Sequence, residues 1–458
     1  MKKSLFALAA VSAIAGTAQA QSSVTVYGVL DLGYVGANTR SANQASTNSA
    51  TNPPASGVVN SQYSTFADGA ESTSRLGFKG NEDLGGGLSA FFTVETALTP
   101  NLQNTISASA NTANRQTFAG LKKAGVGQFA FGTQYTTIHN AVAATDPGMQ
   151  NNMMGNVIYD KFSGIGASQG AQATGNAIGA SNSTASAGTF NYSGQQNNTS
   201  YTVRANNMLS IASDTFAGFQ GNAFYVLDNF NTNSGTLATT SSGGYAGGTT
   251  NHTGWGLGAN YTWQKLLVTA NYQNFTDKNP YAVSTAGVYT TGLPTMNGWG
   301  GTSVPGTNAR DNQQYYAATY DFGILKAYVQ YINRKTMDVN NSNMYVARTG
   351  QQIGVRSFVT PTVETWASVG TGKYTESLSA NGNTFTNQVA STPSGASNAA
   401  SFRAFQLGTN YWLSKRTNLY AIYGQQSQSN QVLVYSASSM NPTSYNMNNY
   451  AVGLRHTF

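Results

Sequence analysis

The chain has 458 residues, a formal net charge of +7, no cysteine and only 9% charged residues. An ordinary soluble domain has about 25% charged residues, so the composition argues against a globular protein with a charged surface in bulk water. The absence of cysteine excludes a disulfide framework, and Lys and Arg form nothing larger than adjacent pairs, which argues against a nucleic-acid partner.

The first twenty residues have the layout of a secretory signal peptide. Lys2 and Lys3 form the charged head, an apolar run extends from Leu5 to Gly16, and Ala18-Gln19-Ala20 provides small residues for cleavage after Ala20. No later stretch has the 18 or more apolar residues that a transmembrane helix needs. The sequence therefore predicts residues 1–20 as a signal peptide and residues 21–458 as one exported domain.

The dominant pattern in the exported domain is an alternation of apolar and polar residues with period two. In residues 257–263, for example, Leu257, Ala259, Tyr261 and Trp263 alternate with small or polar residues. Such alternation indicates strands with one apolar and one polar face. Sixteen segments show it: 24–36, 60–80, 87–97, 113–123, 127–135, 199–211, 217–229, 253–263, 266–275, 313–321, 324–334, 352–360, 363–374, 403–413, 417–427 and 446–458.

The connections between these strands alternate between short and long. Residues 264–265 and 322–323 are short turns, whereas long polar connections cover 230–252, 276–312, 335–351, 375–402 and 428–445. This rhythm is typical of an up-and-down barrel whose two rims meet different environments. We therefore predict an all-β protein, a 16-stranded antiparallel transmembrane β-barrel with short periplasmic turns and long extracellular loops. A soluble sandwich would instead carry many Lys and Glu residues on its polar faces.

Residues 136–198 form the longest interval without alternation. Its first half, residues 143–162, contains Asp146, Pro147 and several Met and Asn residues, and is interpreted as ordered. Its second half, residues 163–198, is rich in Gly, Ala, Ser, Thr and Asn and is interpreted as a mobile excursion. A loop of this length in a compact structure is usually functional or disordered.

Five segments, in order along the chain, resemble the general diffusion porins of Gram-negative bacteria, particularly those of β-proteobacteria. They are Ser23–Asp31 (SVTVYGVLD), Ser74–Leu88 (SRLGFKGNEDLGGGL), Arg115–Leu121 (RQTFAGL), Phe216–Phe219 (FAGF) and Tyr450–Phe458 (YAVGLRHTF). The resemblance implies a homotrimer in the outer membrane and a third loop that folds into the channel. It also implies that the terminal aromatic residue, Phe458, is a signal for the barrel-assembly machinery.

Three arginines are candidates for a basic wall at the channel constriction. Strand parity places Arg75 on the face opposite Leu76 and Phe78, Arg204 opposite Tyr201 and Val203, and Arg115 opposite Phe118. An arginine directed at lipid would cost about 2–4 kcal/mol at the membrane midplane, so all three are expected to face the lumen. Only the resemblance places them at the height of the constriction.

The resemblance also assigns an acid on the third loop to the constriction, and Asp146 occupies that position. The family's second loop acid corresponds to Gln150, and an arginine common in the preceding strand corresponds to Thr133. Three arginines facing one acid would give an anion-preferring pore. Asp146 as an ordinary loop carboxylate before proline is an equally good interpretation of the sequence.

The favoured function is passive diffusion of ions and small hydrophilic solutes, without an enzymatic step, a metal site or a cofactor. The three histidines, His139, His252 and His456, are far apart in the chain and form no recognisable catalytic motif. Two alternatives stay open. Inward-facing aromatics such as Tyr328 and Trp412 would suit a substrate-specific channel, and the loops 276–312 and 375–402 would suit a surface-binding, adhesin-like barrel. Calcium bound by loop acids also stays open.

Overall fold

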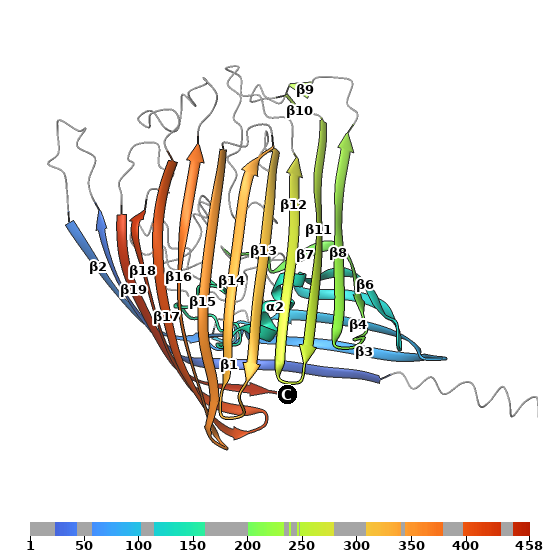
Figure 1. Ribbon diagram of the computed structural model, residues 1–458, viewed down its shortest axis with the longest axis horizontal. Helices are drawn as coiled ribbons and strands as arrows, with labels where there is room; N and C mark the ends of the chain where they lie inside the picture. Colours follow the sequence, from blue (N-terminus) through green and yellow to red (C-terminus); the bar gives the residue numbers. More distant parts are fainter. Residues whose placement is uncertain are drawn as a thin grey trace, which may run out of the picture.

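A computed structural model describes residues 23–43, 57–101, 114–160, 200–232, 238–239, 245–246, 248–278, 308–339, 344–378, 397–431 and 443–458. The predicted signal peptide, 1–20, and the second half of the third loop, 163–198, lie outside the described residues. In the part of the chain that is described, one antiparallel sheet contains 17 strands and closes on itself (Figure 1). No described helix has the length and apolar character needed to cross a bilayer.

The strands follow one another around the barrel in chain order. Their bounds are β1 (Ser23–Asn43), β2 (Gly57–Asp68), β3 (Arg75–Gly85), β4 (Leu88–Ala97), β5 (Asn114–Lys123), β6 (Gly127–Tyr135), β7 (Arg204–Ser213), β8 (Phe219–Thr232), β11 (Gly248–Trp263), β12 (Leu266–Lys278), β13 (Asn308–Asp321), β14 (Lys326–Asp338), β15 (Met344–Thr360), β16 (Val363–Leu378), β17 (Ser397–Ser414), β18 (Thr417–Gln431) and β19 (Thr443–Thr457). Two short strands, β9 (Ala238–Thr239) and β10 (Tyr245–Ala246), pair separately.

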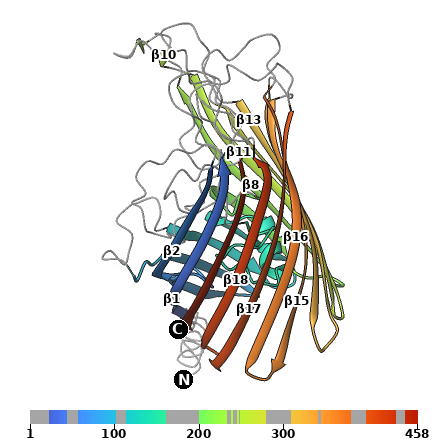
Figure 2. The ribbon, with the colours of Figure 1, turned by 90° about the vertical axis from the view of Figure 1, so that its left-hand side faces the viewer.

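The barrel closes because β1 pairs with β19 on one side and with both β2 and β3 on the other (Figure 2). β2 and β3 occupy one position between them, so the 17 strands fill 16 positions, as the sequence predicted. The predicted single strand 60–80 is interrupted at residues 69–74. The carboxylate of Asp31 accepts hydrogen bonds from the backbone N–H groups of Glu71 (2.8 Å) and Ser72 (2.6 Å), which replaces ladder bonds lost there.

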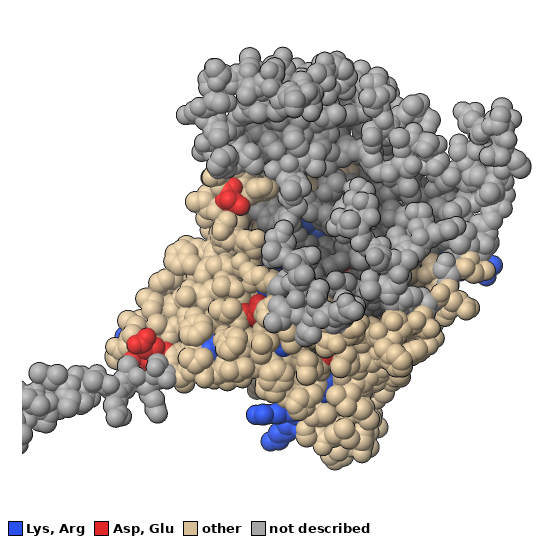
Figure 3. All heavy atoms as spheres, turned by 180° about the vertical axis from the view of Figure 1, so that it is seen from behind, with Lys and Arg blue, Asp and Glu red and all other residues tan. Residues whose placement is uncertain are grey.

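The outer wall is apolar and the inner wall is polar. On β14, Val329 is 52% exposed on the outside, whereas the neighbouring Gln330 is 1% exposed on the inside. Figure 3 shows one face, on which few charged side chains interrupt the described surface. This is the reverse of a soluble protein and is expected for a barrel surrounded by lipid. The prediction of a membrane barrel rather than a soluble sandwich is therefore confirmed.

At one rim of the barrel, turns of two to five residues join successive strands, as at residues 264–265 and 361–362. At the other rim, the strands are longer than the sequence predicted. The predicted loop 335–351 is mostly strand, because β14 continues to Asp338 and β15 begins at Met344. In these extensions Lys335 and Ala347 alternate with the buried Thr336 and Arg348. Both faces carry polar residues there, so apolar periodicity could not reveal the strand.

The first part of the third loop lies against the inner wall. It begins with α2 (Thr137–Thr145), whose N-cap, Thr136, accepts a hydrogen bond from the backbone N–H of His139 (3.3 Å). Ile138 and Val142 of α2 are fully buried, and the helix contacts β8 and β11–β14 (Figure 1). The sequence analysis noted only that this segment lacks period-two alternation and assigned no helix, although a threonine cap followed by apolar residues four apart is a helix-start signal.

Residues 146–160 continue along the wall formed by β15–β19. The backbone N–H of Val157 donates to Gln352 (2.8 Å), and the side-chain amide of Gln406 donates to the carbonyl oxygen of Met154 (2.8 Å). Glycines make room for this close approach, since a methyl group at Gly424 would collide with the backbone carbonyl of Met154. The loop is therefore held to the wall by both polar contacts and shape.

Candidate constriction site

Six neighbouring strands place one polar side chain each on a continuous stretch of the inner wall. We call this group the arginine belt; it consists of Tyr27 (β1), Arg75 (β3), Glu95 (β4), Arg115 (β5), Tyr135 (β6) and Arg204 (β7). Arg115 and Arg204 are almost completely buried and Arg75 is half-buried. All three arginines point inward.

Glu95 connects the members of the arginine belt. Its carboxylate accepts a hydrogen bond from Nε of Arg115 (2.6 Å) and another from the hydroxyl of Tyr27 (3.1 Å). Arg115 also donates to the hydroxyl of Tyr135 (2.7 Å), and the guanidinium of Arg204 lies 5.8 Å from the centre of the Tyr135 ring. The six side chains of the belt thus include three guanidinium groups and one carboxylate, and Arg115 forms the direct ion pair.

The sequence analysis did not identify Glu95 as part of the site. The signal was available, because Glu95 lies in a predicted strand between the apolar residues Val94 and Ala97, and a carboxylate in a membrane strand must face inward. A period-two pattern cannot show how neighbouring strands are aligned with one another. Gly77 pairs with both Tyr27 and Glu95 across neighbouring strands, and this alignment brings the tyrosine hydroxyl to the carboxylate.

Arg115 reaches the belt through a β-bulge. Glu95 pairs with Gln116 and Thr96 pairs with Asn114, so Arg115 is the extra residue of β5. A bulge redirects the side chain of the inserted residue, which here allows Arg115 to turn toward the lumen beside Glu95. The parity argument took Phe118 as facing lipid, but Phe118 lines the inner wall. Arg115 faces inward because of the bulge and not because of simple alternation.

Arg204 faces inward for a different reason from the one that the sequence suggested. Tyr201 and Val203 were expected on the lipid side, but they are 0% and 4% exposed and pack against Ile138 and Val142 of α2. The strand begins only at Arg204. The apolar residues before it therefore cover the third loop, because they lie in the chain segment that returns from that loop to the wall.

Asp146 belongs to a different network. It is 2% exposed, and its carboxylate accepts hydrogen bonds from the backbone N–H of Gln150 (2.6 Å) and the side-chain amides of Asn156 (2.8 Å) and Gln352 (3.4 Å). Burial raises the pKa of the Asp146 carboxyl, although the bonds from Gln150 and Asn156 act in the opposite direction. The structure thus brings the three arginines together and places Asp146 in the internal bonding of the loop.

Aromatic side chains of the loop, rather than Asp146, face the belt. The ring of His139 lies 4.2 Å from that of Tyr135 and 6.0 Å from that of Tyr159. Tyr135 in turn accepts a hydrogen bond from Arg115 (2.7 Å). The loop side of the belt therefore presents the rings of His139 and Tyr159 next to the tyrosine that binds Arg115.

Three other inward arginines form ion pairs on the remaining wall. Arg334 pairs with Asp311 (2.6 Å), Arg348 with Asp160 (3.0 Å) and Arg356 with Glu364 (2.5 Å). Each pair is buried and neutral as a unit. These arginines differ from the belt, where positive charge exceeds negative charge.

Two acids, Asp31 and Glu71, form hydrogen bonds at the interruption between β2 and β3. Besides its backbone partners, Asp31 accepts a hydrogen bond from the hydroxyl of Tyr420 (2.7 Å). Glu71 accepts from the side-chain amides of Asn410 (2.8 Å) and Asn418 (2.9 Å). These carboxylates are held by neutral donors and add negative charge to the inner wall.

A polar cavity lies beside α2 on the inner wall. It has a volume of about 500 Å³, and its lining combines the side-chain amides of Gln116, Gln134, Asn140 and Asn260 with the rings of Phe91, Phe118 and Tyr135. Among the described residues, neither a carboxylate nor a basic side chain lines it. Such a surface holds water and small polar solutes without selecting by charge.

The inward aromatic residues named by the sequence have mixed surroundings. Tyr328 is 7% exposed, with the ammonium group of Lys326 lying 5.3 Å from its ring centre. The indole N–H of Trp412 donates to Glu364 (3.1 Å), which is also the partner of Arg356. Their inward direction agrees with the sequence parity, but Trp412 is engaged with a wall ion pair.

Comparison with known proteins supports the same assignment of family. An outer membrane porin protein of Bordetella pertussis is 32% identical over 176 residues, which are 35% of this chain and 43% of that protein. Outer membrane porin protein 32 of Delftia acidovorans is 44% identical over 95 residues, which are 21% of this chain and 22% of that protein. The matched segments thus span less than half of either relative.

Solved porin structures share the fold over nearly the whole chain. The anion-selective porin from Comamonas acidovorans is 18% identical, with a TM-score of 0.56 over 96% of this chain and 100% of that one. OmpT of Vibrio cholerae is 16% identical, with a TM-score of 0.50 over 95% of this chain and 98% of that one. The family model described as Gram-negative porin matches residues 7–431. The chain therefore belongs to the Gram-negative porin family and is a protein of the bacterial outer membrane.

Proposed function

We propose that the protein forms a water-filled channel through which ions and small hydrophilic solutes diffuse down their gradients, with a preference for anions. The observation that carries the anion preference is the arginine belt, in which three guanidinium groups accompany the single carboxylate of Glu95. Fixed charge beside a narrow aqueous path concentrates ions of the opposite sign. The Comamonas protein that shares the fold is an anion-selective porin, which agrees with this proposal.

The other charges of the inner wall weaken this preference without replacing it. The pairs of Arg334, Arg348 and Arg356 are neutral, and Asp146 has a raised pKa and is surrounded by amide donors. Asp31 and Glu71 are further acids of the inner wall, at the interruption between β2 and β3. The belt sets the ion selectivity where the loop that carries α2 narrows the channel at the height of the belt.

The test of the proposal is the reversal potential of the purified protein in planar bilayers under a KCl gradient. Low salt is needed, because the screening length is about 10 Å at 0.1 M and about 3 Å at 1 M. A potential of the sign set by chloride, together with stable conductance steps, supports the proposal. A potential of the sign set by potassium contradicts the anion preference, and an absence of steps from folded protein contradicts the open channel.

Glu71→Gln should increase the anion preference. The amide keeps the size of the side chain and removes one negative charge from the inner wall. A unit charge at about 5 Å in water changes an ion's energy by about 0.8 kcal/mol. We expect the chloride-to-potassium permeability ratio to rise about threefold, measured as a reversal potential. Glu82→Gln, on an exposed part of β3 near the turn, is the matched control and should leave the ratio unchanged. An unchanged ratio in Glu71→Gln would show that Glu71 does not act on the permeating ion.

We also propose a homotrimer and a role for Phe458 in assembly. Phe458 is 43% exposed on the outer wall together with Leu454 and Val452, and its backbone exchanges hydrogen bonds with Gly28 (3.1 and 3.2 Å). Phe458 thus lies at the seam where β19 meets β1, with an aromatic ring available to the barrel-assembly machinery and to lipid. The assembled state can be measured as the mass of the unheated protein.

A further inference from the structure

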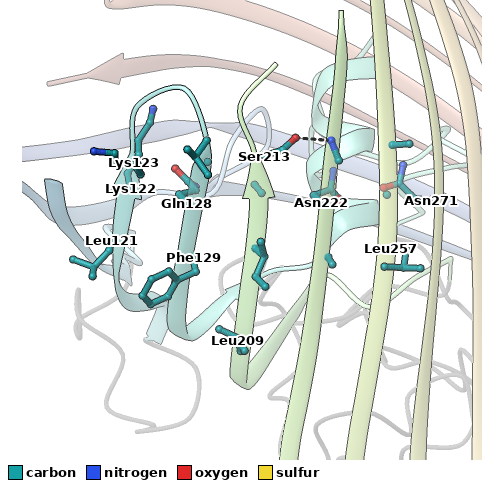
Figure 4. Close-up of a pocket in the computed structure, with 18 of the residues that line it drawn as sticks. Leu121, Lys122, Lys123, Gln128, Phe129, Leu209, Ser213, Asn222, Leu257 and Asn271 are labelled. Carbon is teal, nitrogen blue, oxygen red and sulfur yellow. Dashed lines mark hydrogen bonds between the residues drawn. The ribbon is translucent and has the colours of Figure 1, made fainter. Parts of the chain in front are cut away.

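The outer wall contains an apolar trough across β5–β8 and β11–β13, with a volume of about 1130 Å³ (Figure 4). Its floor is built by three small residues on neighbouring strands. Ala259 of β11 pairs with Gly221 of β8 on one side and with Ala270 of β12 on the other. Ala270 pairs in turn with Tyr316, which bounds the trough. Because three small side chains lie in register, the wall is hollow where its neighbours carry large residues.

The sides of the trough are hydrocarbon surfaces. Phe129, Ile211 and Leu257 are 39%, 55% and 56% exposed, and all three line it. They belong to the outward faces of their strands, which are the faces that meet the membrane interior in a barrel of this family. An occupant of the trough must therefore be apolar over most of its length.

One end of the trough is polar and positively charged. Lys122, Lys123, Gln128 and Ser213 line this end, next to the turn that joins β5 to β6, whereas Leu121, Phe129 and Leu209 lie further from it (Figure 4). Lys123 donates to the carbonyl oxygen of Gly86 (2.5 Å). The nearby acid Asp214 accepts from the backbone N–H of Gly125 on the same turn (2.6 Å). Two ammonium groups against one carboxylate leave this end positive.

We propose that the trough binds an anionic phospholipid of the surrounding membrane, with an acyl chain on the Gly221–Ala259–Ala270 floor and the phosphate at Lys122 and Lys123. The argument is one of complementarity, since an anionic headgroup attached to a hydrocarbon chain matches a cationic rim that continues into an apolar trough. Lipid also surrounds this wall at high local concentration. The binding site is separate from the lumen and does not depend on the ion selectivity of the channel.

The test is native mass spectrometry of the folded protein in detergent, titrated with dioleoylphosphatidylglycerol and, separately, with dioleoylphosphatidylcholine. We expect retained phosphatidylglycerol at stoichiometric amounts and much weaker retention of the zwitterionic lipid. Lys122→Gln with Lys123→Gln should weaken phosphatidylglycerol retention about thirtyfold, a factor of about five for each lysine near an anionic headgroup. Lys265→Gln, at the neighbouring β11–β12 turn, is the charge control and should bind as before.

Ala259→Leu tests the floor of the trough independently of charge. The larger side chain fills the hollow, so retention of both lipids should be lost, whereas Ala367→Leu on the outward face of β16 should have no effect. Equal retention of the two lipids, unchanged by these variants, would overturn the proposal. Dissociation of an oligomer by Ala259→Leu would also overturn it, because a second copy of the chain would then be the occupant. Channel conductance is expected to be normal in Lys122→Gln with Lys123→Gln, which separates this test from that of the channel.

Discussion

Replacing Arg75 and Arg204 together by glutamine should remove the anion preference of the channel. The two substitutions remove two of the three positive charges of the belt, and they leave the pair of Arg115 and Glu95 (2.6 Å) intact. At about 0.8 kcal/mol for each charge at about 5 Å in water, the chloride-to-potassium permeability ratio should fall by about an order of magnitude. The measurement is the reversal potential at low ionic strength.

The choice of residues protects the fold in this experiment. Removing Arg115 would leave the buried carboxylate of Glu95 without its ion-pair partner, which costs about 3–5 kcal/mol in comparable sites. Arg403→Gln is the matched control, because Arg403 is exposed on the outer face of β17 and its loss changes net charge without changing the lumen. An unchanged ratio in the double variant would refute the assignment of the belt as the selectivity element.

Replacing Arg348 by methionine should release part of the third loop from the wall. The Arg348 side chain is 0% exposed, and it donates to the carbonyl oxygen of Val157 (2.7 Å), to Asp160 (3.0 Å) and to the hydroxyl of Tyr374 (3.1 Å). Without the guanidinium, the buried Asp160 loses this cation, at a cost of about 3–5 kcal/mol. Detaching residues 157–160 lets the carboxylate reach water, so we expect a larger and noisier single-channel conductance with the barrel still folded.

A second variant displaces the same loop without removing charge. Gly424→Ala places a methyl group against the carbonyl of Met154, so it should change conductance in the same direction as Arg348→Met. Gly221→Ala is the control, since its new methyl group would have Ser213 as its nearest neighbour at 3.9 Å. If both loop variants conduct as the unmodified protein does, the loop does not limit the path.

The alternation in the sequence was sufficient to predict the barrel because one face of each strand meets lipid and the other face meets the aqueous lumen. Leu257 and Val329 lie on the outer wall and Gln330 lies inside, as their positions predicted. The method failed at the upper ends of β14 and β15, where Lys335 and Ala347 are not clearly apolar and both faces contact polar groups. It also merged β2 with β3, because the bonds of Asp31 to residues 69–74 span about 40 positions of the chain.

The amino-acid order alone was enough for the strand count, the inward direction of Arg75 and the family, since each follows from local parity or from contiguous motifs. Arg115 and Arg204 face inward because of a bulge and of the packing against the third loop, which the sequence did not show. What those arginines contact depends on the folded barrel. The partnership of Arg115 with Glu95 requires a bulge and the register between β4 and β5. The place of Asp146 among Gln150, Asn156 and Gln352 depends on how the loop packs against β15. Such contacts join residues that are distant in the chain, and their energies depend on the complete barrel around them.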